Sequence, residues 1–357
     1  MKKVTSSDVA RLAGVSQTTV SMILNNKIGP SFSEETKNRV LDAARQLRYS
    51  LPAQNAVATP QRLIAVFAPT LSNPYYTQLI SAIEKYALSQ GYKILLCNTS
   101  RDKEQEAYYL SYFSKAKVNG IIFTFVPSYP QMAEQISLSV PVVLIGEKTP
   151  ALTIPSIELD NVKAGFIIGK HLLALGHTWF AFFSTPFDNI TLARSQRLEG
   201  LRQALREAGL EKNLYIFSEE HITESDASST PYEYEVGRSL AERFLLQKNN
   251  PATSLIGVND MTALGIINCL TEHGCHVPDD YSVCGFDNIF IGNVFVPSIT
   301  TIDHHLHLRA QSAVDMILSK QPNPLQEKPF MQPVAQVNRI EYEPLLLARN
   351  STGHARH

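Results

Sequence analysis

The chain has 357 residues, too many for one ordinary compact core, which favours a small domain joined to a large one. Hydrophobic residues make up 44% of the chain and charged residues 18%, a balance that excludes wholesale disorder. The formal net charge is −1, but residues 1–60 hold eight Lys or Arg against four Asp or Glu, so this part carries +4 and the rest −5. A basic head on an acidic body suits an anionic partner for the head alone.

The first residues are polar after Met1-Lys2-Lys3, without the apolar run of a signal peptide. No apolar stretch reaches the ~18 residues that a membrane-spanning helix needs. The four cysteines show no CxxC spacing and lie among apolar residues, as reduced core thiols do. We therefore expect a cytoplasmic protein with no membrane segment.

Residues 4–25 predict two short helices separated by a tight turn at Gly14-Val15. Ser6 or Ser7 is expected to cap the first helix and Ser16 the second. A third helix is expected to begin after Ser33, with acidic residues in its first turn. The second helix has a buried stripe at i, i+3 and i+4, formed by Val20, Ile23 and Leu24.

Residues 51–62 differ in character: Ser50-Leu51-Pro52 begins this stretch and Thr59-Pro60 ends it, and the six residues between can hold at most a turn or two of helix. This stretch is expected to be a hinge or linker. It separates a headpiece, residues 1–50, from a large domain, residues 63–350.

From Leu63 onward, short apolar runs alternate with helical stretches, which predicts parallel sheets buried on both faces. About ten strands in two series favour two doubly wound α/β subdomains, with ligands at the carboxyl ends of the strands. The expected N-subdomain is about 63–160 and 305–333, the C-subdomain about 161–304 and 334–350, and residues 351–357 form a frayed tail. The expected helices cover about 75–89, 102–117, 161–175, 194–209, 235–247 and 260–273.

The headpiece closely resembles that of the lactose/galactose repressor (LacI/GalR-type) family of transcriptional regulators. Many positions match in order at fixed spacing, so the signal is far more specific than a lone helix-turn-helix pattern. The matching segments are Asp8-Val9-Ala10, Ala13-Gly14-Val15-Ser16, Thr19-Val20-Ser21, Leu24-Asn25, Ser33-Glu34-Glu35-Thr36, Arg39-Val40, Ala43-Ala44, Leu47 and Tyr49.

The resemblance implies that the second helix enters the major groove of double-stranded DNA. Short polar side chains on its outer face can hydrogen-bond to base edges, and helix starts can hold phosphates. The expected DNA-binding residues are Thr5, Ser16, Gln17, Thr18, Ser21, Met22, Asn25, Val57 and Ala58.

Two positions depart from the family pattern. Met22 stands where the family often has Arg; it can contact a thymine methyl but cannot hydrogen-bond to guanine, which favours A·T readout at that base pair. Packing within the headpiece is the alternative role for Met22. The linker has Val57 and Ala58 but not the Leu that relatives wedge into the minor groove, so a smaller kink is expected.

The resemblance continues through the large domain, in segments such as Asn73-Pro74-Tyr75-Tyr76, Arg197-Leu198-Glu199-Gly200 and Gly285-Phe286-Asp287. This layout is similar to periplasmic sugar-binding proteins, whose two lobes close around a ligand. A sugar site needs polar groups for hydroxyls and an aromatic ring for the sugar face. The residues expected to bind the effector are Tyr75, Tyr76, Asp160, Arg197, Asn259 and Asp287, with Glu147 as a weaker candidate.

A small-molecule-controlled transcriptional repressor is the function that this resemblance implies. We expect a homodimer on a pseudo-palindromic operator, with a sugar or sugar derivative as effector and a purine-type ligand as the alternative. A solute-binding protein and a cytosolic enzyme are the other classes considered. The basic headpiece argues against the first, and the absence of GxSxG, P-loop, GxGxxG and HExxH motifs argues against the second. No cofactor or metal is expected.

Overall fold

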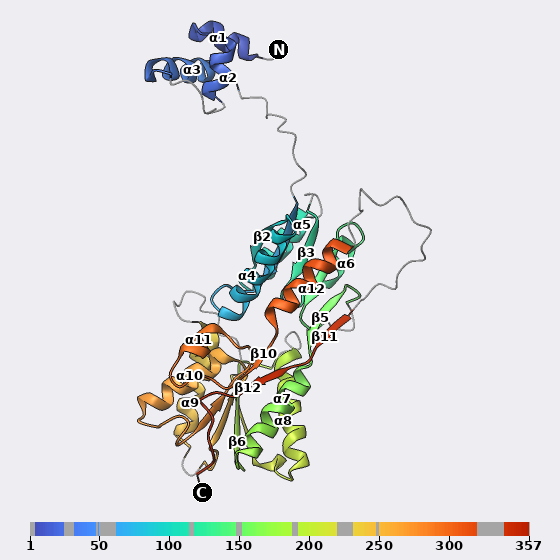
Figure 1. Ribbon diagram of the computed structural model, residues 1–357, viewed down its shortest axis with the longest axis vertical. Helices are drawn as coiled ribbons and strands as arrows, with labels where there is room; N and C mark the ends of the chain where they lie inside the picture. Colours follow the sequence, from blue (N-terminus) through green and yellow to red (C-terminus); the bar gives the residue numbers. More distant parts are fainter. Residues whose placement is uncertain are drawn as a thin grey trace, which may run out of the picture. The chain divides into compact units, whose positions relative to one another are not determined.

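The computed structural model describes residues 4–24, 32–47, 49, 62–113, 118–147, 152–187, 192–219, 231–247, 250–319 and 339–356. The chain divides into two compact units, Met1–Pro60 and Gln61–His357 (Figure 1). Three residues proposed to bind DNA, Asn25, Val57 and Ala58, lie outside the described residues.

The first unit contains three helices, as the sequence predicts: α1 (Ser6–Ala13), α2 (Gln17–Leu24) and α3 (Glu34–Gln46). Each helix contributes one fully buried valine to a common small core, namely Val9, Val20 and Val40. Ile23 and Leu24 pack against this core while remaining partly exposed. The apolar stripe of α2 therefore faces inward as predicted.

The caps of these helices differ from the prediction at one position. Ser16 accepts a hydrogen bond from the backbone N–H of Thr19 at 3.0 Å, and Ser33 accepts from Thr36 at 3.3 Å. The first helix, however, is capped by Thr5 rather than by Ser6 or Ser7. The Asp8 carboxylate accepts from the backbone N–H of Thr5 at 2.9 Å, which satisfies a donor that the helix itself leaves unpaired.

The second unit has two lobes, each built on a parallel sheet. The first lobe holds a six-stranded sheet in the order β11-β5-β4-β3-β1-β2. Its strand β1, which lies between β3 and the edge strand β2, alternates between two cores: Ile64 and Val66 pack on one face, and Ala65 and Phe67 on the other. Because both faces are covered by helices, the strand is apolar throughout. The strands are β1 (Leu63–Ala68), β2 (Lys93–Asn98), β3 (Gly120–Phe123), β4 (Val142–Ile145), β5 (Ser156–Leu159) and β11 (Arg339–Tyr342).

Figure 1 shows α4 (Pro74–Ser89) and α12 (Leu306–Ser319) side by side against this first sheet, and residues of both pack in the same core. Residues of α5 (Lys103–Phe113) and α6 (Pro130–Ser137) pack in the core on the opposite face. The sequence pattern did not predict α6 or β5, because both are short and neither shows a clear period.

The second lobe holds a four-stranded parallel sheet in the order β7-β6-β8-β9. Two pairs of helices cover its faces: α7 with α8, and α9 with α10. The strands are β6 (Phe180–Ser184), β7 (Leu214–Ser218), β8 (Ser254–Gly257) and β9 (Ser282–Cys284). The helices are α7 (Asn161–Ala174), α8 (Leu192–Glu207), the 3-10 helix η1 (Glu211–Asn213), α9 (Tyr232–Leu245), α10 (Asp260–Glu272) and α11 (Phe290–Val294).

The chain passes between the lobes three times: from β5 to α7, from β10 (Thr301–Asp303) to α12, and from β11 to β12 (Leu345–Leu347). In the antiparallel pair β10–β12, Ile302 lies opposite Leu346. The assignment of all of residues 334–350 to the C-subdomain was wrong, because β11 pairs in parallel with β5 in the first sheet. A strand can add to a distant sheet edge without any local signal in the sequence.

The last residues are not a frayed tail. Ser351 is fully buried and donates its hydroxyl proton to the carbonyl oxygen of Val283 at 2.6 Å. The backbone N–H of Ala355 donates to the carbonyl oxygen of Leu175 at 2.9 Å. The C-terminal segment, which we define as residues 348–356, is therefore part of the second lobe.

Candidate functional site

A cavity of about 150 Å³ lies between the two lobes of the second unit. Its walls come from the carboxyl ends of strands: Glu147 follows β4, Val258 and Asn259 follow β8, and Asp287 follows β9. This is where parallel sheets place ligands, because the strand ends and helix starts converge there. A cavity of this volume accepts a single six-membered ring.

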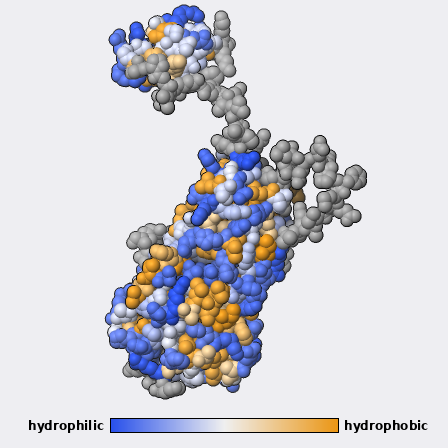
Figure 2. Space-filling view, in the orientation of Figure 1, coloured by the Kyte–Doolittle hydropathy of each residue, from blue (hydrophilic) through white to orange (hydrophobic). Residues whose placement is uncertain are grey.

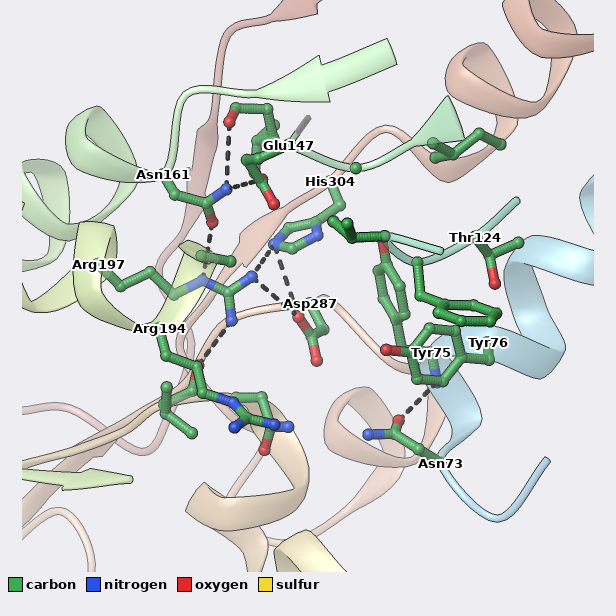
Figure 3. Close-up of a pocket in the computed structure, with 18 of the residues that line it drawn as sticks. Asn73, Tyr75, Tyr76, Thr124, Glu147, Asn161, Arg194, Arg197, Asp287 and His304 are labelled. Atoms are coloured by element: carbon green, nitrogen blue, oxygen red, sulfur yellow. Dashed lines mark hydrogen bonds and ion pairs between the residues drawn. The ribbon is translucent and has the colours of Figure 1, made fainter. Parts of the chain in front are cut away.

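Arg197 is the hub of the polar groups in this cavity (Figure 3). Its guanidinium donates to Asn161 Oδ1 at 2.8 Å and to the carbonyl oxygen of Val258 at 2.7 Å. The remaining nitrogen, Nη2, lies 3.3 Å from His304 Nε2 and 3.6 Å from Asp287 Oδ1. We expected the guanidinium group of Arg197 to hydrogen-bond to a ligand, but in this structure its nitrogens contact other groups of the protein. Arg197 therefore organises the site.

Asp287 is buried and lies near two basic side chains, with its Oδ1 also 3.6 Å from His304 Nε2. Burial raises the pKa of Asp287 well above its ordinary value, and the Arg197 charge opposes that shift. Burial, followed by the Arg197 charge, lowers the pKa of His304 well below its ordinary value. A neutral imidazole beside a guanidinium is the result.

Tyr75 and Tyr76 form the aromatic wall, as the sequence predicts (Figure 3). Their rings meet edge to face with centroids 5.2 Å apart, and Tyr75 meets the His304 ring at 5.4 Å. The Tyr75 hydroxyl accepts a hydrogen bond from Arg309 Nη1 at 3.1 Å, which fixes the ring. Burial raises the pKa of Tyr76 to about 12, so both rings stay neutral in the physiological range.

Sequence reasoning missed several charged groups of the cavity. Arg101, from the loop after β2, lies 3.6 Å from Glu233 of α9 on the other lobe. Glu147, which the sequence offered as a weaker candidate, also lines the cavity; it accepts a hydrogen bond from Asn161, and burial raises its pKa. Neither Arg101 nor Glu233 stands in a recognisable motif, so only the folded chain brings them together. The other polar residues that sequence reasoning missed are Asn73, Thr124, Asn161, Arg194, His304 and Arg309.

Two candidates have local structural roles. Asp160 does not line the cavity; its carboxylate caps α7 by accepting from the backbone N–H of Lys163 at 2.8 Å. Asp160 is thus a helix cap, and its neighbour Asn161 points into the site instead. Asn259 does line the cavity, but its side-chain oxygen Oδ1 caps α10 by accepting from the backbone N–H of Thr262 at 2.9 Å. Only the amide nitrogen of Asn259 is left to face a ligand.

In the first unit, the outer face of α2 is open to solvent. Thr5, Ser16, Gln17 and Thr18 are exposed, and Ser21 and Met22 are partly exposed. The Gln17 amide donates to Ser6 Oγ at 2.8 Å, which joins α2 to the start of α1. The short polar side chains therefore project away from the small core, as a groove-reading helix requires.

The sequence matches two family models. Residues 5–51 match the bacterial regulatory proteins of the lacI family, and residues 61–328 match the periplasmic binding proteins and sugar binding domain of the LacI family. The chain belongs to the LacI family. It is therefore a transcriptional regulator with a helix-turn-helix headpiece and a ligand-binding domain.

Curated relatives carry regulator names. The chain is 35% identical to the HTH-type transcriptional regulator DegA of Bacillus subtilis over 84% of this chain and 86% of that protein. It is 33% identical to the repressor PurR of Mannheimia succiniciproducens over 83% and 85%. These names describe regulators, not enzymes.

Solved structures show the same fold. A LacI family regulator from Enterococcus faecium, with bound ribose, superposes with a TM-score of 0.68 at 22% identity, covering 83% of this chain and all of that one. A LacI family protein from Silicibacter pomeroyi gives a TM-score of 0.68 at 23% identity, covering 98% of this chain and 99% of that one.

None of the helices in the described part of the chain combines the length and the apolar character of a membrane-spanning segment. The same part holds no group of three or more His, Cys, Asp or Glu placed to bind a metal ion.

Proposed function

We propose that this LacI family member is a repressor that binds its operator as a dimer and responds to an uncharged sugar in the cavity between the lobes. The observation that carries the effector proposal is the charge compensation inside that cavity. Arg197 faces Asp287 at 3.6 Å, and Arg101 faces Glu233 at 3.6 Å. Every charge of these two pairs has an opposite charge from the protein itself.

The remaining charged groups of the cavity support the same ligand class. The positive charge of Arg309 is the main electrostatic influence that favours ionised Glu147. Arg194 donates to the carbonyl oxygen of Pro186 at 2.8 Å. The lining holds four arginines and three carboxylates, so all but one of its charges can be compensated by the protein itself. Sugar hydroxyls can both donate to the carboxylates and accept from the guanidinium groups.

Two buried nitrogens also point to a polar ligand. Among the described residues, His304 Nδ1 and Arg309 Nε have no hydrogen-bond partner, and both side chains line the cavity. Buried polar atoms without a partner are uncommon in folded proteins, and a ligand is one way to satisfy them. The aromatic wall formed by Tyr75 and Tyr76 would cover the apolar face of a sugar ring.

A dimer is supported by apolar side chains that lie open on both lobes. On the first lobe, Leu95 and Leu96 of the edge strand β2 are 41% and 38% exposed. On the second, Figure 2 shows apolar residues at the surface over α11, where Phe290 and Val294 are 65% and 57% exposed. The N–H of Phe290 donates to Gln78 Oε1 of α4 at 3.1 Å, so α11 and α4 are neighbours across the lobes. Such exposure is typical of a surface that a second copy covers.

The name repressor rests on the curated relatives called PurR. Two headpieces in one dimer would each read half of a pseudo-palindromic site, and their combined binding would give useful affinity. On α2, the hydrogen-bonding side chains of Gln17 and Thr18 are exposed, and those of Thr19 and Ser21 are partly exposed. Met22 is proposed to favour A·T at the base pair that it faces.

Three measurements test this function. Selection of duplexes from a random pool, followed by mobility shifts at moderate salt, should recover an inverted repeat; recovery of a single unrepeated site would contradict the dimer. Sedimentation should give a dimer that dissociates when Leu96 and Val294 are both replaced by Asp, and a stable tetramer would overturn the dimer proposal.

The effector class can be tested by thermal melting with neutral monosaccharides, uronic acids, sugar phosphates or purine bases. A neutral sugar should raise the melting temperature, since ligands of the native state raise its stability. Stabilisation by a purine base alone would reject the sugar.

A further inference from the structure

The loop that carries Asp287 has an unusual backbone. We call residues 287–289 the Asp287 loop. Asp287 has φ of 124° and Asn288 has φ of 54°, two successive side-chain-bearing residues with positive φ. Residues with a side chain rarely adopt such angles, and they persist only where the surroundings hold them in place. The conformation of this loop decides where the Asp287 carboxylate lies in the cavity.

Three side chains hold the Asp287 loop from outside the cavity wall. Asp260 accepts from the N–H of Ile289 at 3.0 Å, and Thr301 accepts from the N–H of Asn288 at 3.2 Å. The third is Arg349, whose Nη2 donates to the side-chain oxygen of Asn288 at 2.6 Å. Asp260 and Thr301 also bond to each other at 2.6 Å, but Arg349 comes from the C-terminal segment.

Arg349 is itself firmly placed. Its other terminal nitrogen donates to the carbonyl oxygen of Ile299 at 3.0 Å, and its backbone N–H donates to Thr300 Oγ1 at 2.9 Å. Two residues later, the buried Ser351 hydroxyl accepts from the backbone N–H of Thr300 at 2.8 Å. The guanidinium therefore reaches the Asp287 loop from a fixed backbone, which lets it act as a brace.

We propose that Arg349 is a positioning residue for effector binding, which holds the Asp287 loop in its left-handed conformation through Asn288. Arg349 does not line the cavity, so it acts on the ligand only through the loop. The part that concerns the ligand rests on the proposed function, in which a sugar occupies the cavity. The C-terminal segment thereby becomes part of the effector site.

The first test needs no ligand. Hydrogen exchange of the full-length protein should show the Ile289 amide exchanging about tenfold faster in Arg349→Met, the change expected for loss of a charge-assisted hydrogen bond. Arg356→Met is the matched control, because Arg356 lies in the same segment and pairs with Asp280 at 2.5 Å, away from the loop. The inference is overturned if Arg349→Met folds and its Ile289 amide exchanges as slowly as in the wild type.

A double-variant comparison separates positioning from a general loss of stability. Asn288→Gly tolerates positive φ but removes the acceptor of Arg349. Adding Arg349→Met to Asn288→Gly should change exchange of the loop little, because the contact is already gone. If Arg349→Met speeds exchange of the loop equally in the wild type and in Asn288→Gly, then Arg349 acts on the fold as a whole and not on the Asp287 loop.

The ligand readout uses D-ribose, D-xylose, D-glucose and D-galactose, each titrated alone. For any of them that raises the melting temperature of the wild type, Arg349→Met should bind about tenfold more weakly, and Arg356→Met should bind as the wild type does. Unchanged affinity in a folded Arg349→Met would overturn the inference. If none of the four stabilises the wild type, the sugar proposal loses its support, while hydrogen exchange still decides whether Arg349 holds the loop.

Discussion

The Arg197 guanidinium and the Asp287 carboxylate lie 3.6 Å apart, with side chains only 9% and 7% exposed. Arg197 comes from α8 and Asp287 from the loop after β9, so the pair ties two elements of the second lobe at the cavity. A buried ion pair adds little net stability, but breaking it leaves an uncompensated charge. The pair is therefore better suited to fixing the geometry of the site than to stabilising the fold.

Replacing Arg197 with Met should lower the free energy of unfolding by about 3–5 kcal/mol, because the buried Asp287 loses its partner. Urea denaturation would measure the change. Arg238→Met is a matched control, since the Arg238–Glu272 pair at 2.9 Å is exposed and should contribute less than about 1 kcal/mol. A loss at position 197 no larger than at position 238 would contradict this account of the pair.

The contribution of His177 to stability should fall as the pH is lowered below about 6.5, the ordinary pKa of histidine. Burial lowers the pKa of His177, whose ring lies 2.8 Å from Thr253 Oγ1 and 2.9 Å from Ser282 Oγ. The unfolded chain then binds a proton that the native imidazole does not, so this contribution is complete above the unfolded pKa and is lost as pH falls through it. Burial also lowers the pKa of His171, which adds to the effect.

Melting temperatures of the wild type and His177→Gln between pH 7.5 and 5.5 would test this titration. The difference in melting temperature between the two proteins should become smaller toward low pH, since glutamine does not titrate. A gap that stays constant over this window would exclude His177 as a source of the pH dependence.

Gly165→Ala should disrupt the packing that places Arg197. A Cβ at position 165 would lie 1.9 Å from the backbone carbonyl oxygen of Arg197, where α7 crosses α8. Because backbone atoms cannot move aside cheaply, we expect a loss of at least about 1–3 kcal/mol together with weaker ligand binding. Ser195→Ala, on the exposed side of α8, should change the unfolding free energy by less than about 0.5 kcal/mol. Calorimetry that ranks the two variants equally would refute the close-packing argument.

Gln17→Ala should weaken binding to a selected operator without unfolding the headpiece. The Gln17 side chain is exposed, and loss of one good base contact costs about 1–3 kcal/mol. Val20→Ala should instead destabilise the headpiece, since Val20 is fully buried. Mobility shifts and circular dichroism of both variants would separate the two roles. If Gln17→Ala binds the operator with wild-type affinity, Gln17 does not contact the DNA.

Much of the fold could be read from local pattern. The strand beginning at Leu63 is apolar at every position because helices cover both faces of its sheet, and that need is visible in the sequence. Capping residues and apolar stripes predict the three headpiece helices. Tyr75, Tyr76 and Asp287 were predictable as cavity residues because each stands at the carboxyl end of a strand or at the helix start that follows it, within a family-like segment.

Tertiary structure alone decided which groups share the cavity and what each one does. Arg101 and Glu233 come from different lobes, and Arg349 reaches the Asp287 loop from 61 residues away. Asp160 caps a helix, whereas its neighbour Asn161 lines the cavity and accepts a hydrogen bond from Arg197. The physical reason is that hydropathy and turn chemistry act over a few residues and so are written locally. The pairing of buried charges depends on distances of a few ångströms, which only the packed chain sets.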